Sequence, residues 1–315
     1  MERDPGQPRA WVGLVLLALL GSLHGCGRPG AGYASAPSQP LRVLAVETFL
    51  ADMAQNVAGD RLQVQALLPI GADPHGYEPT PADVVRVAEC DLLIVNGAGF
   101  EGFIQQLLAS AGGQHRVIEA SAGLTSRSPR PGEATGDHPE GDPHFWLDPN
   151  NAIHYVENIR DGLSQADPGG AAIYAWNAES YVAQLRTLDQ WVVEQVRQVP
   201  PERRLLVTNH ESFGYYADRY GFQVIGTIVP SVSSGASPSA QQLARLVERI
   251  KATGAPVIFL ETGTNPQLAQ QVARETGVAV VTGLHTHSVT APGGPAPTYV
   301  EMIRYNTRAI VEALR

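Results

Sequence analysis

Short apolar runs alternate with amphipathic helical stretches along most of the chain. Residues 41–69 predict a strand, a turn, a helix, a glycine and a second strand, and residues 203–230 repeat that order. A second pair of similar segments covers residues 90–120 and 255–283. Such alternation is typical of βα units with parallel sheets. The pattern therefore predicts an α/β protein with two Rossmann-like βα lobes.

The longest uninterrupted helical pattern lies between these halves, from Ala171 to Val199. Apolar residues recur there at helical spacing, and no glycine or proline interrupts them. A helix of 29 residues would be about 44 Å long, enough to run along two lobes. We therefore expect an N-terminal lobe over 41–167, a linking helix over 168–201 and a C-terminal lobe over 202–315.

Residues 1–25 have the layout of an export signal. The uncharged stretch from Trp11 to Leu23 follows two arginines and is too short to span a bilayer comfortably. The sequence Leu-His-Gly-Cys that ends at Cys26 resembles the lipobox of bacterial lipoproteins, which implies a lipid anchor on Cys26. Ordinary cleavage that leaves a free thiol is the alternative. Residues 26–40 are rich in Gly, Pro, Ser and Ala and are expected to form a flexible tether.

This layout predicts a protein exported to the outer face of the cytoplasmic membrane or to the periplasm. Composition narrows the classes of partner further. Of the 315 residues, 43% are hydrophobic and 17% are charged, as in a packed soluble protein. The formal net charge of -9 argues against nucleic acid as a partner. Apart from Cys26 the chain has one cysteine, Cys90, which is expected to be a small buried hydrophobe without a disulfide.

Two of the nine histidines share a prefix, because the tripeptide Asp-Pro-His ends at His75 and again at His144. Proline fixes its own φ and restricts the residue before it, so each histidine is expected to leave a stiffened backbone. Stiffness is useful where a side chain must be aimed. His24 falls within the export signal, and His115 and His154 are expected to have no role in a site.

Other histidines follow apolar strands. His210 comes directly after one strand, and His285 and His287 follow the last strand. Together with His75 and His144, these residues put at least one histidine at the carboxyl end of a strand in each of four βα units. Ligands of open parallel sheets bind at that edge, and neutral imidazole suits zinc, copper, nickel and iron. A metal site between the lobes is predicted, with the choice between His285 and His287 left open.

The residues favour capture of a metal over catalysis. A hydrolytic zinc site usually has three protein ligands, a water in an open position and a general base, for which Glu211 is the candidate. The chain has no His-Glu-x-x-His, no Gly-x-Ser-x-Gly and no phosphate-binding glycine loop. Four protein ligands would close the coordination sphere. A zinc-dependent hydrolase is the alternative from another class, and an adhesion or interaction protein, which needs no convergent histidines, is a third.

Several segments together resemble the metal-specific solute-binding proteins of ABC transporters, the zinc/manganese group. They are GADPHGYEPTPADV, NGAGFEGFI, DPHFWLDPNNA, TNHESFGYYADRYGF and GGPAPTYVEMIRYN. The resemblance covers about Leu41 to Arg315. It implies two βα lobes joined by one long rigid helix, one metal between the lobes, and delivery to a membrane permease powered by an ATPase. The protein is expected to work as a monomer.

The resemblance also implies a ligand set. The third ligand of this family is commonly His in zinc-type members and Glu in manganese-type members, so His210 favours zinc, with manganese or iron as the alternative. The fourth position departs from the family, because Leu-His-Thr-His-Ser stands where an Asp is usual. The four implied ligands are His75, His144, His210 and His287.

Four neutral histidines leave the charge of a divalent ion uncompensated, and burying net charge is costly. We therefore expect a carboxylate nearby, with Glu261 as the first candidate and Glu211 as the second. Alternatively, His287 points away, and His285 or water completes the site.

Residues 126–143 contain His138 among several acidic residues. They resemble a short form of the acidic, His-rich loop of zinc-type relatives, which would recruit metal weakly. A disordered polar loop explains the same composition.

Overall fold

The structure is a computed structural model that describes residues 41–128 and 141–315. The predicted export signal, Cys26, the tether and His138 lie outside the described residues. None of the described helices is long and apolar enough to cross a membrane.

The first half of the described chain is a β-α-β-α-β-α-β unit with a four-stranded parallel sheet in the order β2-β1-β3-β4. Thr80 caps helix α2 reciprocally with Asp83, and Pro81 fills the first helical position. The elements are β1 (Val43–Ala45), α1 (Thr48–Ala58), β2 (Val64–Ala66), α2 (Pro81–Glu89), β3 (Leu92–Val95), α3 (Ile104–Ala111) and β4 (Arg116–Glu119).

The second half repeats this topology, with a parallel sheet in the order β6-β5-β7-β8. The predicted α/β fold with two βα lobes is confirmed. The elements are β5 (Leu205–Thr208), α6 (Gly214–Tyr220), β6 (Gln223–Thr227), α7 (Ala240–Thr253), β7 (Val257–Glu261), α8 (Gln267–Thr276) and β8 (Ala279–Leu284).

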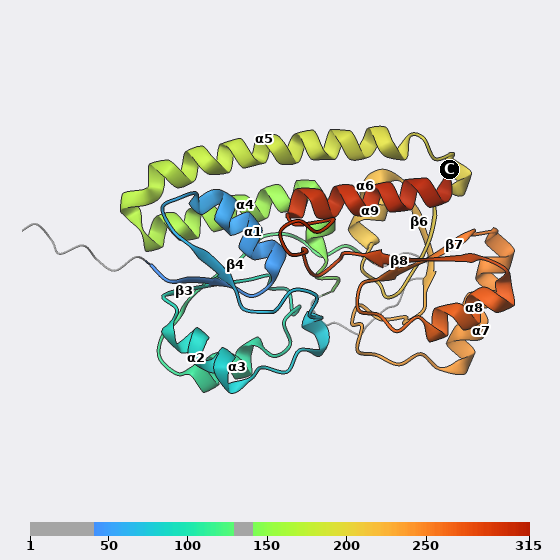
Figure 1. Cartoon of the computed structure of the whole chain (residues 1–315), viewed down its shortest axis with the longest axis horizontal. Helices are drawn as coiled ribbons and strands as arrows, with labels where there is room; N and C mark the ends of the chain where they lie inside the picture. Colours follow the sequence, from blue (N-terminus) through green and yellow to red (C-terminus); the bar gives the residue numbers. More distant parts are fainter. Residues whose placement is uncertain (1–40, 129–140) are drawn as a thin grey trace, which may run out of the picture. The chain divides into compact units, whose positions relative to one another are not determined.

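Three long helices lie along one side of both sheets (Figure 1). They are α4 (Pro149–Ala166), α5 (Ala171–Val196) and α9 (Tyr299–Leu314). Helix α5 has 26 residues and ends earlier than the predicted Val199. The backbone N–H groups of Gln198 and Val199 bond three residues back, because Pro200 follows and the last turn tightens.

The inner strands β1, β3, β5 and β7 are buried on both faces, and their side chains alternate between two cores. Val43 and Ala45 of β1 face the largest core, while Leu44 and Val46 face a smaller core beneath α2 and α3. The largest core also contains residues of α1, α4, α5, α6 and α9, so the two βα units share one apolar interior. Cys90 packs at the edge of the smaller core but is only half-buried, less than predicted, because it caps the end of α2.

Candidate metal centre

All four implied ligands lie on loops that leave the carboxyl ends of strands. His75 lies in a 3-10 turn (Pro74–Gly76) after β2, and His144 lies after β4, just before a second such turn (Phe145–Leu147). His210 follows β5 and His287 follows β8. The positions of these histidines in the two sheets match only in part. His144 and His287 follow the corresponding strands β4 and β8, but His75 follows β2, whereas His210 follows β5, the counterpart of β1.

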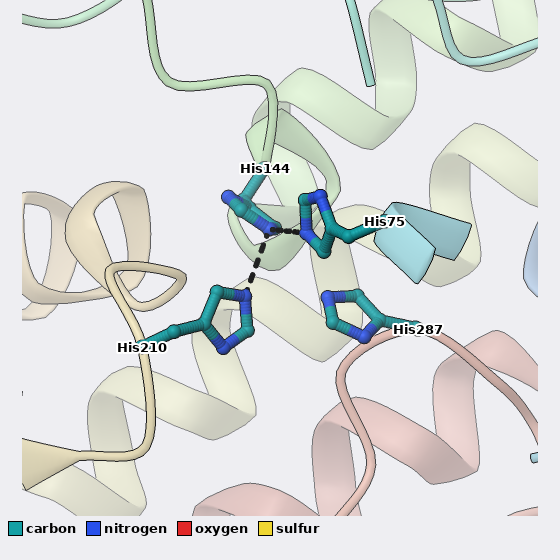
Figure 2. Close-up of side chains that lie close together, drawn as sticks. All are labelled: His75, His144, His210 and His287. Atoms are coloured by element: carbon teal, nitrogen blue, oxygen red, sulfur yellow. Dashed lines mark hydrogen bonds between the residues drawn. The ribbon is translucent and has the colours of Figure 1, made fainter. Parts of the chain in front are cut away.

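The four imidazole rings meet at one point (Figure 2). One ring nitrogen from each histidine lies within 4.8 Å of those of the others. The Nε2 atom of His144 lies 3.3 Å from Nε2 of His75 and 3.3 Å from Nε2 of His210. Nitrogens around a tetrahedral zinc, each bonded at about 2.0–2.1 Å, are separated by about 3.3 Å. The two spacings from His144 match that value, and the other nitrogens lie within 4.8 Å, close enough to converge on one ion.

The repeated prefix holds the histidines through its aspartates as well as its prolines. Asp73 Oδ1 accepts a hydrogen bond from the backbone N–H of His75 at 3.0 Å. Asp142 Oδ1 accepts the corresponding bond from His144 N at 3.0 Å and lies 2.9 Å from His144 Nδ1. A proton on Nδ1 leaves the Nε2 lone pair of His144 directed at the cluster. The sequence reasoning missed these two aspartates, although the repeated tripeptide was their signal.

Glu261, at the end of β7, is the carboxylate beside the cluster. Its Oε1 lies 2.8 Å from His210 Nδ1, and its Oε2 lies 3.9 Å from His287 Nδ1. Burial alone would raise the pKa of Glu261, but the two neighbouring imidazoles and hydroxyl hydrogen bonds lower it to about 2. The first candidate for a counter-charge thus lies where it can compensate a bound cation.

The surroundings shift the pKa values of the two histidines of the second half in opposite directions. Burial lowers the pKa of His287 to about 4, which keeps its ring neutral near pH 7, and its buried Nε2 has no hydrogen-bond partner within the described part of the chain. At His210, burial opposes protonation, but the Glu261 charge outweighs it and raises the pKa. Burial also raises the pKa of Asp142 to about 7.

Aromatic rings wall off the cluster. Phe100 lies with its ring centroid 4.9 Å from that of His75, and Trp146 lies 5.2 Å from that of His144. The His144 and His210 side chains have no exposed surface, and His287 is 9% exposed. His75 is the partly exposed member. Low water access strengthens the electrostatic interactions of a bound ion.

His285 and Glu211 do not belong to the group of four converging residues. The ring of His285 packs against Tyr305 with centroids 5.2 Å apart. The backbone N–H of His285 donates to the Asn306 side chain, and its backbone oxygen accepts from that side chain. Glu211 Oε1 accepts a hydrogen bond from Thr227. His115 and His154, which were expected to have no role in a site, contact the backbone carbonyl groups of Gly112 and Ala122.

The base of the loop 126–143 is ordered by contacts to α6. Tyr215 donates a hydrogen bond to the backbone oxygen of Asp142 and accepts one from the backbone N–H of Arg127. The Arg127 guanidinium also pairs with Asp218 of α6 at 2.9 Å. The acidic, His-containing middle of the loop lies outside the described residues.

Comparison with known proteins identifies the family of the chain. The family model described as "ZnuA: Zinc-uptake complex component A periplasmic" matches residues 43–313. The manganese-binding lipoprotein MntA of Halalkalibacterium halodurans is 33% identical over 301 residues, which cover 96% of each chain. The iron-binding protein YfeA of Yersinia pestis is 32% identical over 275 residues, 87% of this chain and 86% of that protein.

A solved structure has the same fold. The periplasmic zinc-binding protein TroA of Treponema pallidum superposes with a TM-score of 0.79 at 28% identity, over 88% of this chain and 99% of that chain. The family model spans nearly all of the described residues, and the fold and the convergent histidines agree with it. The chain belongs to the ZnuA family of metal-binding solute-binding proteins of ABC transporters.

Proposed function

We propose that the protein captures a zinc ion through His75, His144, His210 and His287. The observation that carries this proposal is the approach of four imidazole nitrogens to within 4.8 Å of one another, with two spacings of 3.3 Å. Uncoordinated imidazoles gain nothing from such crowding, whereas a tetrahedral zinc requires it. Glu261 supplies negative charge beside the ion, and Asp142 fixes the orientation of one ring.

The donor set favours zinc over manganese. Manganese prefers carboxylate, carbonyl and water oxygens, whereas imidazole nitrogen suits zinc. In this chain both carboxylates of the site stand behind imidazoles, at Asp142 and Glu261. The relatives named for manganese and iron make those metals the second candidates within the same function.

The same proposal includes delivery of the ion to an ABC permease and its ATPase from outside the cytoplasm. Relatives named as substrate-binding lipoproteins of metal ABC transporters support it. The lipobox-like sequence that ends at Cys26 is the corresponding feature of this chain. A lipid on Cys26 would hold the protein at the membrane while residues 26–40 act as its tether.

A hydrolytic role is disfavoured by the same geometry. Four nitrogens fill a tetrahedral zinc sphere and leave no position for a reactive water. Glu211, the candidate base, bonds to Thr227, and Glu261 faces imidazole nitrogens. Neither carboxylate stands over an open coordination position.

Metal analysis of protein purified without added metal tests the proposal, followed by competition of zinc against manganese in the presence of a calibrated chelator. We expect one zinc per chain and a preference for zinc of at least about 100-fold, since nitrogen sites follow the Irving–Williams order. Absence of tight binding of either metal would overturn the proposed function. Preference for manganese would overturn only the choice of zinc and would leave metal capture in place.

A further inference from the structure

The buried histidines require a route for the ion, and a cavity beside them reaches His287 and Glu261. It has a volume of about 330 Å³ and runs between the loop that carries His75 and the loops at the carboxyl edge of the second sheet. We call it the entry cavity. Its polar lining includes Asp73, Asn209, Ser234, Glu261, Thr264 and His287.

Two carboxylates stand along this cavity. Glu261 lies at the inner end beside His210 and His287, and Asp73 lies at the outer end with 47% of its side chain exposed. Oxygen groups can hold a hydrated divalent cation, and a cleft lined by negative charge raises the local concentration of cations. The lining therefore suits an ion that still carries water, before it exchanges that water for imidazole nitrogen.

Asp73 also connects the two halves of the chain across the cavity. Its Oδ1 accepts the bond from His75 N and lies 3.9 Å from His287 Nδ1, while its Oδ2 accepts a hydrogen bond from Ser234. Ser234 lies on the loop between β6 and α7. The bond thus ties the loop of the most exposed histidine to the opposite wall.

We propose that the entry cavity is the passage of the ion to and from the histidines, and that Asp73 and Ser234 form its gate. Asp73 attracts the hydrated cation from outside. Its bond to Ser234 then holds the loop of His75 in place and slows release of the ion. This inference rests on the proposed function and concerns the rates of capture and release rather than the existence of the site.

Three single variants and the wild-type protein test the gate by stopped-flow transfer of zinc to and from a chromogenic chelator. Ser234→Ala removes the hydroxyl group, and we expect release about threefold to tenfold faster, since a hydrogen bond to a charged group is lost. Ser234→Thr keeps a hydroxyl group and should release zinc at nearly the wild-type rate. Ser233→Ala is the matched control, because Ser233 accepts a bond from Gly235 N and makes none with Asp73 among the bonds described.

Asp73→Asn tests the attraction through the rate of uptake, because its amide nitrogen also replaces the oxygen that accepts from Ser234. The amide oxygen can still accept the bond from His75 N, so the histidine keeps its support while the charge is lost. We expect slower uptake, about threefold to tenfold at low ionic strength, and a weaker dependence of uptake on salt.

The outcomes separate this inference from the proposed function. If the wild-type protein binds no zinc, the proposed function fails. If it binds zinc and Ser234→Ala releases it at the wild-type rate, or Asp73→Asn takes it up with unchanged rate and salt dependence, the gate is wrong and the histidine site stands.

Discussion

The tripeptide Asp-Pro-His is a small device for presenting an imidazole ring. Its proline restricts the backbone, as the sequence indicates, but its aspartate makes the defining contact, at Asp73 with His75 and at Asp142 with His144. That contact depends on side-chain rotamers, which a sequence pattern does not specify. The residues alone also left His285 and His287 unresolved. The structure separates them, because the ring of His285 packs on Tyr305 and Asn306 holds the His285 backbone, whereas His287 belongs to the four-ring cluster.

The fourth ligand is testable by a matched pair of variants. His287→Ala removes one nitrogen from the cluster and should weaken zinc binding by at least about 100-fold, since a four-nitrogen sphere loses one ligand. His285→Ala should change affinity by less than about threefold, because that ring packs on Tyr305. Both are measured by chelator competition. Equal affinities for His287→Ala and the wild type would remove His287 from the ligand set.

The counter-charge is testable in the same assay. Glu261→Gln keeps the shape of the side chain but removes the negative charge 2.8 Å from His210 Nδ1. We expect zinc affinity to fall about 10-fold to 100-fold, as is typical when a carboxylate behind a metal-binding histidine is lost. Glu211→Gln is the control and should have the smaller effect. The reverse order would show that the charge compensation comes from Glu211.

A buried acid pair in the first half of the chain predicts an unusual pH dependence of stability. Glu47 is 1% exposed, and its carboxyl interacts with that of Glu101, which also accepts the N–H groups of Asn96 and Gly97. Burial raises both pKa values, that of Glu101 to about 7. The folded protein therefore binds more protons at this pair than the unfolded chain does. The free energy of unfolding that comes from these bound protons is lost as the pH rises through 7.

Urea unfolding of the metal-free protein between pH 6 and pH 8 measures this effect. The free energy of unfolding should fall with rising pH, with up to about 1.4 kcal/mol per pH unit for one proton. Glu47→Gln should flatten that dependence, because it removes one of the two titrating groups. An unchanged slope in Glu47→Gln would show that Glu47 does not contribute to the pH dependence.

At the scale of elements, helix starts were predictable and one helix end was not. Thr80 and Asp148 cap α2 and α4, because their short polar side chains accept bonds from the first turn. The end of α5 at Val196 was missed, since the tightened turns before Pro200 contain ordinary helix-forming residues.

Helix α5 is tied to both halves of the chain by one buried carboxylate. Asp189 accepts hydrogen bonds from Asn150 of α4 and from Arg219 and Tyr220 of α6. Asp189→Ala should lower the free energy of unfolding by about 1–3 kcal/mol, because the buried hydroxyl of Tyr220 and the exposed donors of Asn150 and Arg219 lose their acceptor. Urea unfolding checks this, with exposed Gln190→Ala on the same helix as the control. A loss below about 0.5 kcal/mol would mean that the tie contributes little.

At the scale of the whole molecule, the alternation of apolar runs and helices was enough to predict two βα lobes and their parallel sheets. It did not predict that both lobes share one apolar core. Phe49 of α1 stacks on Trp146 at 4.5 Å, and Trp146 donates a hydrogen bond to the backbone of Thr286 in the second half. Such contacts join residues distant in sequence, and periodicity carries only local information. The shared core explains how histidines from both halves are held at one point.

X-ray absorption spectroscopy at the zinc edge of the zinc-loaded protein measures how many imidazole nitrogens bind the ion. We expect four nitrogen neighbours at about 2.0–2.1 Å, with the outer-atom scattering of imidazole rings. A shell dominated by oxygen, or one with fewer than three imidazoles, would contradict the proposed histidine site.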